Sequence, residues 1–439
     1  MYVMNDKVST IRVDEDRIDT QKNGQQNNKS SLDYSFKKKI IENVLILQGG
    51  GSLGAFGCGV FKALSQNDVK IDIVAGTSIG GVNAAIIAGS KNEKHPEQFL
   101  EEFWLELADS FVDLDKFSPT LYPFFEQLIA NYYYYYYSST LQQEKNESMK
   151  KIEEYRNKAM TDFLSSAIFG NDKMFKARWR LEYALKDPQY FQPAKWTYLY
   201  DHSPLATTLE KYIDYDKLKP KGNPNSRLII TAVNVLTSEP LIFDSYEKQV
   251  TAKHILATCG YPAYNLPWIE VEEGVYAWDG GLLSNTPLRE VINASPINDK
   301  RIFLVENYPK KVTALPENLP EVYHRTRDIM FCDKTLNTLT MSKVITRYLR
   351  FIDELYQMID KCIDMKNVDK GQVEKIRRKY KKYKQDSGAE IKDVHYISRD
   401  ETVHSIYENA DFSPKVIKNS IREGESKTKQ ILDEIGKNR

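Results

Sequence analysis

The stretch LILQGGGSLGAFGCGVFKAL, residues 45–64, places three consecutive glycines between an apolar run and a segment with helical character. The apolar run predicts a buried strand over 44–47, and the small and apolar residues that follow predict a helix over 55–66. The glycines fit the G-x-G-x-x-G pattern of a dinucleotide-binding turn. They fit equally well a loop whose backbone N–H groups stabilise an oxyanion. The two interpretations imply different chemistry.

The following segment, IDIVAGTSIGGVNAAIIAG over residues 71–89, separates them. A dinucleotide site requires an acidic residue at the C-terminal end of the second strand, whereas Asp72 lies at the opposite end. The C-terminal end carries GTSIG instead, between a buried strand and a helix of small residues. This context is typical of a nucleophile elbow, a tight turn that exposes Ser78, and Gly76 and Gly80 allow the backbone to pass close to that serine.

Parallel neighbouring strands would place the glycine loop and Ser78 at the same edge of a sheet. The backbone N–H groups of Gly50, Gly51 and Ser52 could then face Ser78, as acyl transfer requires. The glycine run is therefore interpreted as an oxyanion loop, and a nicotinamide- or flavin-dependent dehydrogenase is the less favoured alternative.

A serine nucleophile needs a base. The segment YAWDGGLLSNTP offers Asp279 at the end of a predicted strand, followed by a tight turn at Gly280 and Gly281. Asn285 and Pro287 are interpreted as turn scaffolding. Taken alone, Asp279 could equally belong to an ordinary Asp-Gly turn.

Histidine is the other candidate base, because the common order in α/β hydrolases is Ser, Asp or Glu, then His. The three histidines that follow the predicted acid are His324, His395 and His404. None of them lies in a recognisable loop at the end of a strand, so all three are predicted to be structural.

The length, charge and cysteine content of the chain narrow the class of protein to which it can belong. The 439 residues suffice for one large or two ordinary domains, and 61 basic residues balance 61 acidic ones, which argues against a nucleic-acid partner. Four scattered cysteines without a C-x-x-C pair indicate reduced thiols and argue against a zinc site or a disulfide framework. The polar N-terminus has no apolar segment of the kind found in a signal peptide, so we expect a cytoplasmic protein.

Along the chain, we predict a disordered polar tail over residues 1–40, an α/β catalytic domain over 41–310 and a helical, charged domain over 311–439. A helical and irregular insertion is expected at about 96–190, and it contains the tyrosine run Tyr132–Tyr137. Further buried strands are expected at 226–236 and 301–307. The Glu-Glu-Gly sequence at 272–274 predicts a hairpin.

The C-terminal region has two notable features. One helical face collects apolar residues at regular spacing, namely Val344, Tyr348, Ile352, Leu355, Ile359 and Cys362. The segment EKIRRKYKKYK, residues 374–384, is strongly basic. It has two interpretations, a peripheral contact with an anionic membrane surface or a solvated helix face.

Three motifs in order, G-G-G-x-x-G, then G-x-S-x-G, then D-G-G, make the chain resemble the patatin-like phospholipases. The resemblance is closest to a prokaryotic branch with an extra C-terminal domain, and it covers about residues 44–308. It implies a three-layer α/β/α fold with a central, mostly parallel sheet. It also implies that Ser78 is the nucleophile, that Asp279 is its base, and that the oxyanion loop comprises Gly49, Gly50, Gly51, Ser52 and Gly54.

The implied activity is that of a serine acyl hydrolase acting on lipid or phospholipid esters, of phospholipase A or lysophospholipase type. The resemblance implies neither a metal ion nor another cofactor. Two alternatives remain at this point. A lipid acyltransferase would use the same dyad with an alcohol as acceptor, and a non-catalytic membrane-docking scaffold would keep the fold without the chemistry.

Overall fold

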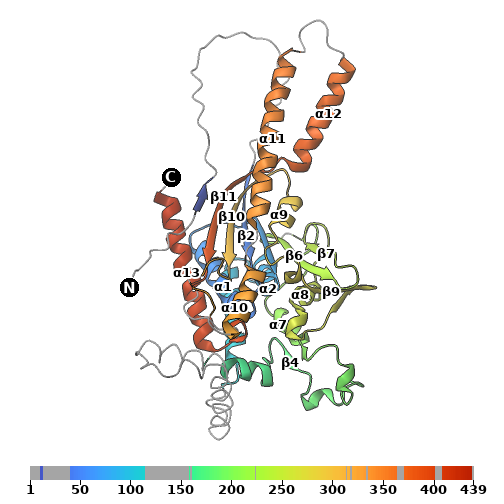
Figure 1. Ribbon diagram of the computed structural model, residues 1–439, viewed down its shortest axis with the longest axis vertical. Coiled ribbons are helices and arrows are strands. Elements are labelled where there is room, and N and C mark those ends of the chain that lie inside the picture. Colours follow the sequence, from blue (N-terminus) through green and yellow to red (C-terminus); the bar gives the residue numbers. More distant parts are fainter. Residues whose placement is uncertain are drawn as a thin grey trace.

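The computed structural model describes residues 10–12, 40–113, 158, 161–222, 224–312, 314–316, 319–332, 335–362, 370–400 and 408–437. The tyrosine run Tyr132–Tyr137, the central part of the predicted insertion, and His404 lie outside the described residues. Figure 1 shows that a twisted sheet forms the centre of the described part, with helices on both sides.

The described residues place nine strands in this sheet. Along it lie β1 (Thr10–Arg12), β11 (Ile391–Ser398), β10 (Asp299–Glu306), β2 (Ile41–Leu47), β3 (Ile73–Thr77), β6 (Arg227–Asn234), β9 (Val275–Asp279) and β8 (Ile269–Glu272), and β7 (Pro240–Asp244) also pairs with β6. The run from β11 to β6 is parallel. The pairs of β1, β7, β8 and β9 are antiparallel. The predicted mostly parallel sheet and the hairpin between β8 and β9 are confirmed.

Alternate residues of β2 enter two separate cores, which defines the three layers. Leu45 and Leu47 pack with the buried residues of helices on one face. These helices are α1 (Gly54–Gln66), α2 (Ile79–Gly89), α3 (Pro96–Asp109), α7 (Ser203–Leu209), α8 (Ala252–Cys259) and α13 (Pro414–Lys437). Val44 and Ile46 pack on the opposite face with α9 (Leu288–Ala294) and with Leu339 of α11 (Thr335–Cys362).

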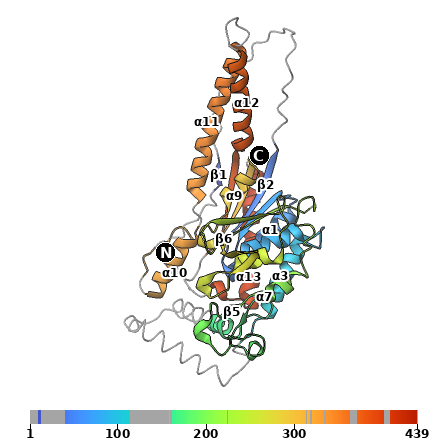
Figure 2. The ribbon, with the colours of Figure 1, turned by 90° about the vertical axis from the view of Figure 1, so that its right-hand side faces the viewer.

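The remaining elements lie at the margins of these layers. They are α10 (Leu319–Phe331), α12 (Lys370–Ser387), the small ladder of β4 (Lys176–Ala177) with β5 (Tyr200–Asp201), and the short helical turns η1 (Gly51–Leu53), η2 (Leu181–Tyr183), η3 (Pro193–Lys195), η4 (Pro262–Tyr264), η5 (Gly280–Leu282) and η6 (Glu408–Ala410). Both views show α11 and α12 as a hairpin that projects from the sheet (Figures 1 and 2).

The C-terminal region does not pack as a separate unit throughout, which corrects the boundary expected at residue 310. β11 extends the central sheet next to β10, and α13 packs across α1. The helices approach closely because of glycine: a Cβ at Gly59 would lie 1.9 Å from the Ile421 carbonyl oxygen, and one at Gly424 would lie 2.1 Å from that of Phe56. The predicted tail also requires a correction, since Thr10–Arg12 forms β1.

Candidate active site

Ser78 lies in the tight turn between β3 and α2, with φ 57° and ψ −132°. This conformation is strained for a residue with a side chain, and such strain concentrates at functional sites. Its glycine neighbours make the turn possible. A Cβ at Gly76 would lie 2.2 Å from the Gly80 carbonyl oxygen, and one at Gly80 would lie 2.2 Å from the Leu47 carbonyl oxygen. The predicted strand, turn and helix around Ser78 are all present.

Strand β6 brings Asp279 to Ser78. β3 pairs along β6 as far as Thr77, which lies opposite Thr231. β9 runs the other way and ends with Asp279 opposite Ala232, the next residue of β6. Because β7 occupies the other edge of β6 over the same stretch, β3 and β9 meet end to end on one edge. The residue after β3 and the last residue of β9 are therefore neighbours, and the Ser78 hydroxyl lies close enough to the Asp279 carboxylate to lower its pKa.

The Asp279 carboxylate is nearly inaccessible to water, with 1% of the residue exposed. Burial raises its pKa to about 7, although the hydrogen bonds from the Gly281 N–H and the Ser78 hydroxyl act in the opposite direction. The Gly281 N–H donates to Asp279 Oδ1 at 2.7 Å, and this bond fixes the carboxylate on the tight turn that follows it. A base with a pKa near neutrality is suited to take a proton from a hydroxyl group.

The glycine loop approaches the nucleophile closely. A Cβ at Gly49 would lie 2.7 Å from Ser78 Cβ, and Gly50 and Gly51 adopt φ values of 151° and 59°. Two residues of the predicted oxyanion loop that lie outside the expected N–H donors use their N–H groups elsewhere. The Gly49 N–H donates to Asn285 Oδ1 at 2.9 Å, and the Gly54 N–H donates to the carbonyl oxygens of Gly51 and Ser52.

The N–H groups of Gly50, Gly51 and Ser52 are the predicted oxyanion donors of the loop. They open the turn η1, and the first N–H groups of a helical turn have no partner within it. Their orientation toward a substrate oxygen stays a prediction.

Polar side chains that the sequence analysis did not assign to the site hold the loop. Asn285 accepts from Gly49, and its Nδ2 donates to the Phe331 carbonyl oxygen at 3.1 Å. Asn307 Nδ2 donates to the carbonyl oxygens of Gln48 and Gly49, each at 3.1 Å. Asn285 therefore does more than the turn scaffolding we expected, because it joins the oxyanion loop to the end of α10.

Hydrogen bonds with Thr258 hold the turn that carries Ser78. The Ser78 N–H donates to Thr258 Oγ1 at 2.9 Å, and the Thr258 hydroxyl donates to the Thr231 carbonyl oxygen at 2.6 Å. Thr258 thus links α8, the Ser78 turn and β6. No motif marks this residue in the sequence.

The short turn η6, far along the chain, lies directly on the glycine loop. Ser52 Oγ donates to the Glu408 carbonyl oxygen at 2.7 Å, and Asn409 hydrogen-bonds Tyr264. The Glu408 carboxylate accepts from Arg327 at 2.8 Å and from Arg399 at 2.9 Å. Burial would raise the pKa of Glu408, but Arg399, His324 and Arg327 lower it to about 2. A buried ionised cluster therefore anchors this turn.

Aromatic rings line the side of the site near Asp279. Tyr261 packs against Tyr264 and Phe331, at ring-centroid distances of 5.0 Å and 5.6 Å. A cavity of about 250 Å³ lies between the turn after Asp279 and the end of α10. Its lining residues are Tyr261, Gly281, Leu282, Leu283, Ser284, Asn285, Thr286, Met330, Phe331, Cys332 and Thr338.

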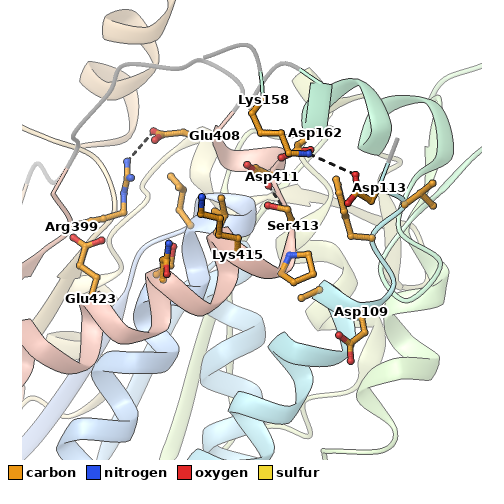
Figure 3. Close-up of a pocket in the computed structure, with 18 of the residues that line it drawn as sticks. Asp109, Asp113, Lys158, Asp162, Arg399, Glu408, Asp411, Ser413, Lys415 and Glu423 are labelled. Atoms are coloured by element: carbon orange, nitrogen blue, oxygen red, sulfur yellow. Dashed lines mark hydrogen bonds and ion pairs between the residues drawn. The ribbon is translucent and has the colours of Figure 1, made fainter. Parts of the chain in front are cut away.

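A larger cavity, of about 1000 Å³, lies on the other side of Leu53 at the start of α13 (Figure 3). The close-up shows many charged side chains around it, including Asp162, Asp411 and Glu408 (Figure 3). Burial and the neighbouring Asp411 raise the pKa of Asp162 to about 7. Apolar residues, among them Leu53, Phe111 and Val112, also line this cavity.

The two candidate histidines that the structure describes, His324 and His395, contact other residues. His324 lies beside Asp328 and Glu408, at 3.3 Å and 3.8 Å. His395 belongs to β11 and stacks on Phe303 with a ring-centroid distance of 5.3 Å. The titratable side chain whose pKa the Ser78 hydroxyl influences is the Asp279 carboxylate.

Sequence comparisons match short stretches of the chain to a lipase and a lysophospholipase. A triacylglycerol lipase of Arabidopsis thaliana, SDP1L, is 34% identical over 76 residues, which cover 17% of this chain and 9% of the lipase. The lysophospholipase nte1 of Aspergillus terreus is 50% identical over 44 residues, which cover 10% of this chain and 3% of that protein. The matches thus span less than a tenth of the length of these two relatives.

Among solved structures, VipD from Legionella pneumophila aligns with a TM-score of 0.35 and 16% identity, over 90% of this chain and 67% of VipD. The family model for patatin-like phospholipases matches residues 45–292, more than half of the chain and the whole span from the glycine loop past Asp279. The chain belongs to the patatin-like phospholipase family.

Proposed function

We propose that this protein hydrolyses lipid esters by means of a Ser78–Asp279 dyad. The observation that carries the proposal is the juxtaposition of the strained serine and a buried carboxylate whose pKa is about 7. Family membership and the lipase and lysophospholipase relatives support a lipid ester as the substrate class.

In the first half of the reaction, Asp279 accepts the hydroxyl proton while Ser78 Oγ attacks the ester carbonyl carbon. The carbonyl oxygen becomes an oxyanion, which the N–H groups of Gly50, Gly51 and Ser52 stabilise. Collapse of the tetrahedral intermediate breaks the ester C–O bond, and the departing alcohol takes the proton from Asp279. An acyl group then remains on Ser78.

In the second half, Asp279 takes a proton from a water molecule that attacks the acyl-enzyme. The same donors stabilise the second oxyanion, and the fatty acid leaves as Ser78 recovers its proton. Because Asp279 is buried, its proton affinity is high enough for both transfers without a histidine.

The aromatic side of the site favours an apolar acyl group. Tyr261 and Phe331 border the small cavity next to Gly281, and Leu282 and Met330 add apolar surface. An acyl chain in this position would place its ester next to the turn that carries Asp279. The exposure of Leu282 and Leu283, at 42% and 53%, fits a route for lipid entering from outside the protein.

The proposal is tested with a labelled phospholipid and a fluorophosphonate probe. Wild type should release free fatty acid and take up the probe at Ser78, whereas Ser78→Ala should do neither. Transfer of the label to an added lipid alcohol without release of fatty acid would identify an acyltransferase. Absence of both probe labelling and ester cleavage in the folded wild type would leave the chain a non-catalytic scaffold.

A further inference from the structure

The hairpin of α11 and α12 is anchored at its base and paired along its length. Leu339, near the start of α11, is buried against the sheet. Further out, Tyr356 stacks on Tyr380 with ring centroids 4.3 Å apart, and Lys384 pairs with Asp353 at 3.3 Å. Two views at right angles show the rest of the hairpin extending beyond the sheet (Figures 1 and 2).

One side of α11 exposes a continuous row of apolar residues. Their spacing alternates between four and three residues, so they lie on one helix face. Between 37% and 65% of each residue is exposed, and the row comprises Met341, Ile345, Tyr348, Ile352 and Leu355. We call these five residues the α11 stripe. A stripe of this kind is expected to face a core or a partner, because exposed apolar patches of this extent mark interaction surfaces.

The second helix of the hairpin supplies positive charge. α12 contains eight basic and two acidic residues. Lys375, Arg378, Lys379, Lys381 and Lys382 are all exposed. Ile376 and Tyr383 of the same helix are also exposed, at 46% and 54%, and add apolar surface between the cations.

We propose that the α11 stripe and the cations of α12 together dock the protein on an anionic membrane surface. The inference rests on the proposed function, because a membrane surface is where an enzyme acting on lipid esters meets its substrate. An amphipathic surface with lysine and arginine beside aromatic and aliphatic side chains is the type that binds the headgroup region of a bilayer. Among the described residues, no helix has the length and apolar character needed to span a bilayer.

The other candidate partner for the hairpin surface is a second copy of the chain, and the positive charge of α12 argues against it. A bundle of two hairpins would bring two copies of α12 close together, and each carries eight basic residues against two acidic ones. Their repulsion opposes such an assembly, whereas anionic lipids neutralise the cations. The chemistry of the surface therefore favours lipid.

The test measures co-sedimentation of the full chain with vesicles in the Ser78→Ala background, so that the lipid is not consumed. Vesicles of phosphatidylcholine with phosphatidylserine should bind the protein, and binding should fall at high salt. Replacing Lys379 and Lys382 by Gln should weaken binding about 25-fold, since each cation contributes roughly a factor of five. Replacing Ile352 and Leu355 by Gln should weaken it about tenfold.

Matched controls come from an exposed segment elsewhere on the protein. Lys186 and Lys195 are exposed lysines, and Leu181 and Leu185 are 80% and 96% exposed. Replacing either pair by Gln should leave vesicle binding unchanged. Circular dichroism of each variant verifies that the hairpin remains helical.

Three outcomes would overturn the proposal: no binding by the Ser78→Ala protein, equal binding to neutral and anionic vesicles, or equal losses in the control variants. Sedimentation velocity adds a fourth, a wild-type dimer that Ile352→Gln and Leu355→Gln dissociate. Because binding is measured without turnover, a failed hydrolase assay would contradict the proposed function while leaving the docking result intact.

Discussion

The Gly49 N–H donates to Asn285 Oδ1 at 2.9 Å, so the oxyanion loop is hydrogen-bonded to the segment that follows the base. Asn285→Ala would leave that N–H and the Phe331 carbonyl without their partner. We expect a loss of about 1–3 kcal/mol in the free energy of unfolding and a fall in kcat of about tenfold to a hundredfold. Steady-state kinetics and urea unfolding provide the measurements.

Asn67→Ala is the matched control for Asn285. Its amide donates to the Ala63 carbonyl oxygen at the end of α1, away from Ser78. This variant should lose some stability and keep its kcat. Equal kcat values in the two variants would show that Asn285 does not position the loop.

Gly51 has φ 59°, and a Cβ there would lie 2.1 Å from the Asn409 carbonyl oxygen. Gly51→Ala should therefore push η6 off the glycine loop as well as distort the oxyanion donors, with a loss of activity of at least about a hundredfold. Gly274 also has a positive φ, 73°, but nothing lies within 4 Å of its Cβ position. Gly274→Ala should lose about 1 kcal/mol of stability and retain activity. Similar activity in the two variants would contradict the role of the loop.

Burial of Asp279 predicts the pH dependence of catalysis. The base must be ionised to accept the Ser78 proton, and its pKa is about 7. The kcat/KM for a soluble ester should therefore fall tenfold for each unit of pH below that value and level off above it. A profile that stays flat down to pH 5 would show that no group with this pKa acts as the base.

The burial of Asp279 also predicts that its ionised carboxylate lowers the stability of the folded state. Burial raises the pKa of Asp279 from an ordinary value of 3.8 to about 7, so the folded state binds the proton more tightly than the unfolded state. The ionised carboxylate thus destabilises the fold above pH 7, and this effect shrinks as pH falls toward 4. Asp279→Asn should unfold at a higher temperature than wild type at about pH 8, by the equivalent of about 2–4 kcal/mol, and at nearly the same temperature at about pH 4. A variant less stable than wild type at high pH would contradict the assignment.

The ionised carboxylate of Glu408 should instead increase the stability of the folded state. Its buried carboxylate lies between Arg327 and Arg399, and the Glu408 pKa is about 2, below its ordinary value of 4.5. Its contribution to stability is present above pH 4.5 and is lost as pH falls toward 2. Glu408→Gln should reduce the free energy of unfolding by about 3–5 kcal/mol at neutral pH, because both guanidinium groups lose their buried countercharge. A loss below about 1 kcal/mol in urea unfolding would contradict this account of the cluster.

The sequence predicted those parts of the site that local chemistry specifies. A tight turn with backbone contacts at 2.2 Å admits only glycine, so Gly76 and Gly80 marked Ser78 without any structure. Asp279 alone could equally have belonged to an ordinary Asp-Gly turn, and it was singled out by its place at the end of a predicted strand and by the order of the three motifs. Repeated apolar residues in short segments likewise predicted the order of strands and helices around the loop.

The features of the site that the sequence did not predict depend on contacts between segments that are far apart in the chain. Ser52 and the Glu408 carbonyl are 356 residues apart, and nothing near either residue indicates the bond. Thr258 lies 180 residues from Ser78, inside an ordinary amphipathic helix. Gly59 lies in the predicted helix over 55–66, where it lets α13 approach, and this depends on Gly424 near the other end of the chain.

The central claim is that Asp279, and no histidine, activates Ser78. The most direct test is the kcat of Asp279→Asn on a soluble ester, measured beside Ser78→Ala, the double variant and His395→Ala. We predict that Asp279→Asn loses several orders of magnitude, that the double variant is little worse than either single variant, and that His395→Ala keeps most of its activity. Substantial turnover by folded Asp279→Asn, together with an inactive histidine variant, would contradict the dyad.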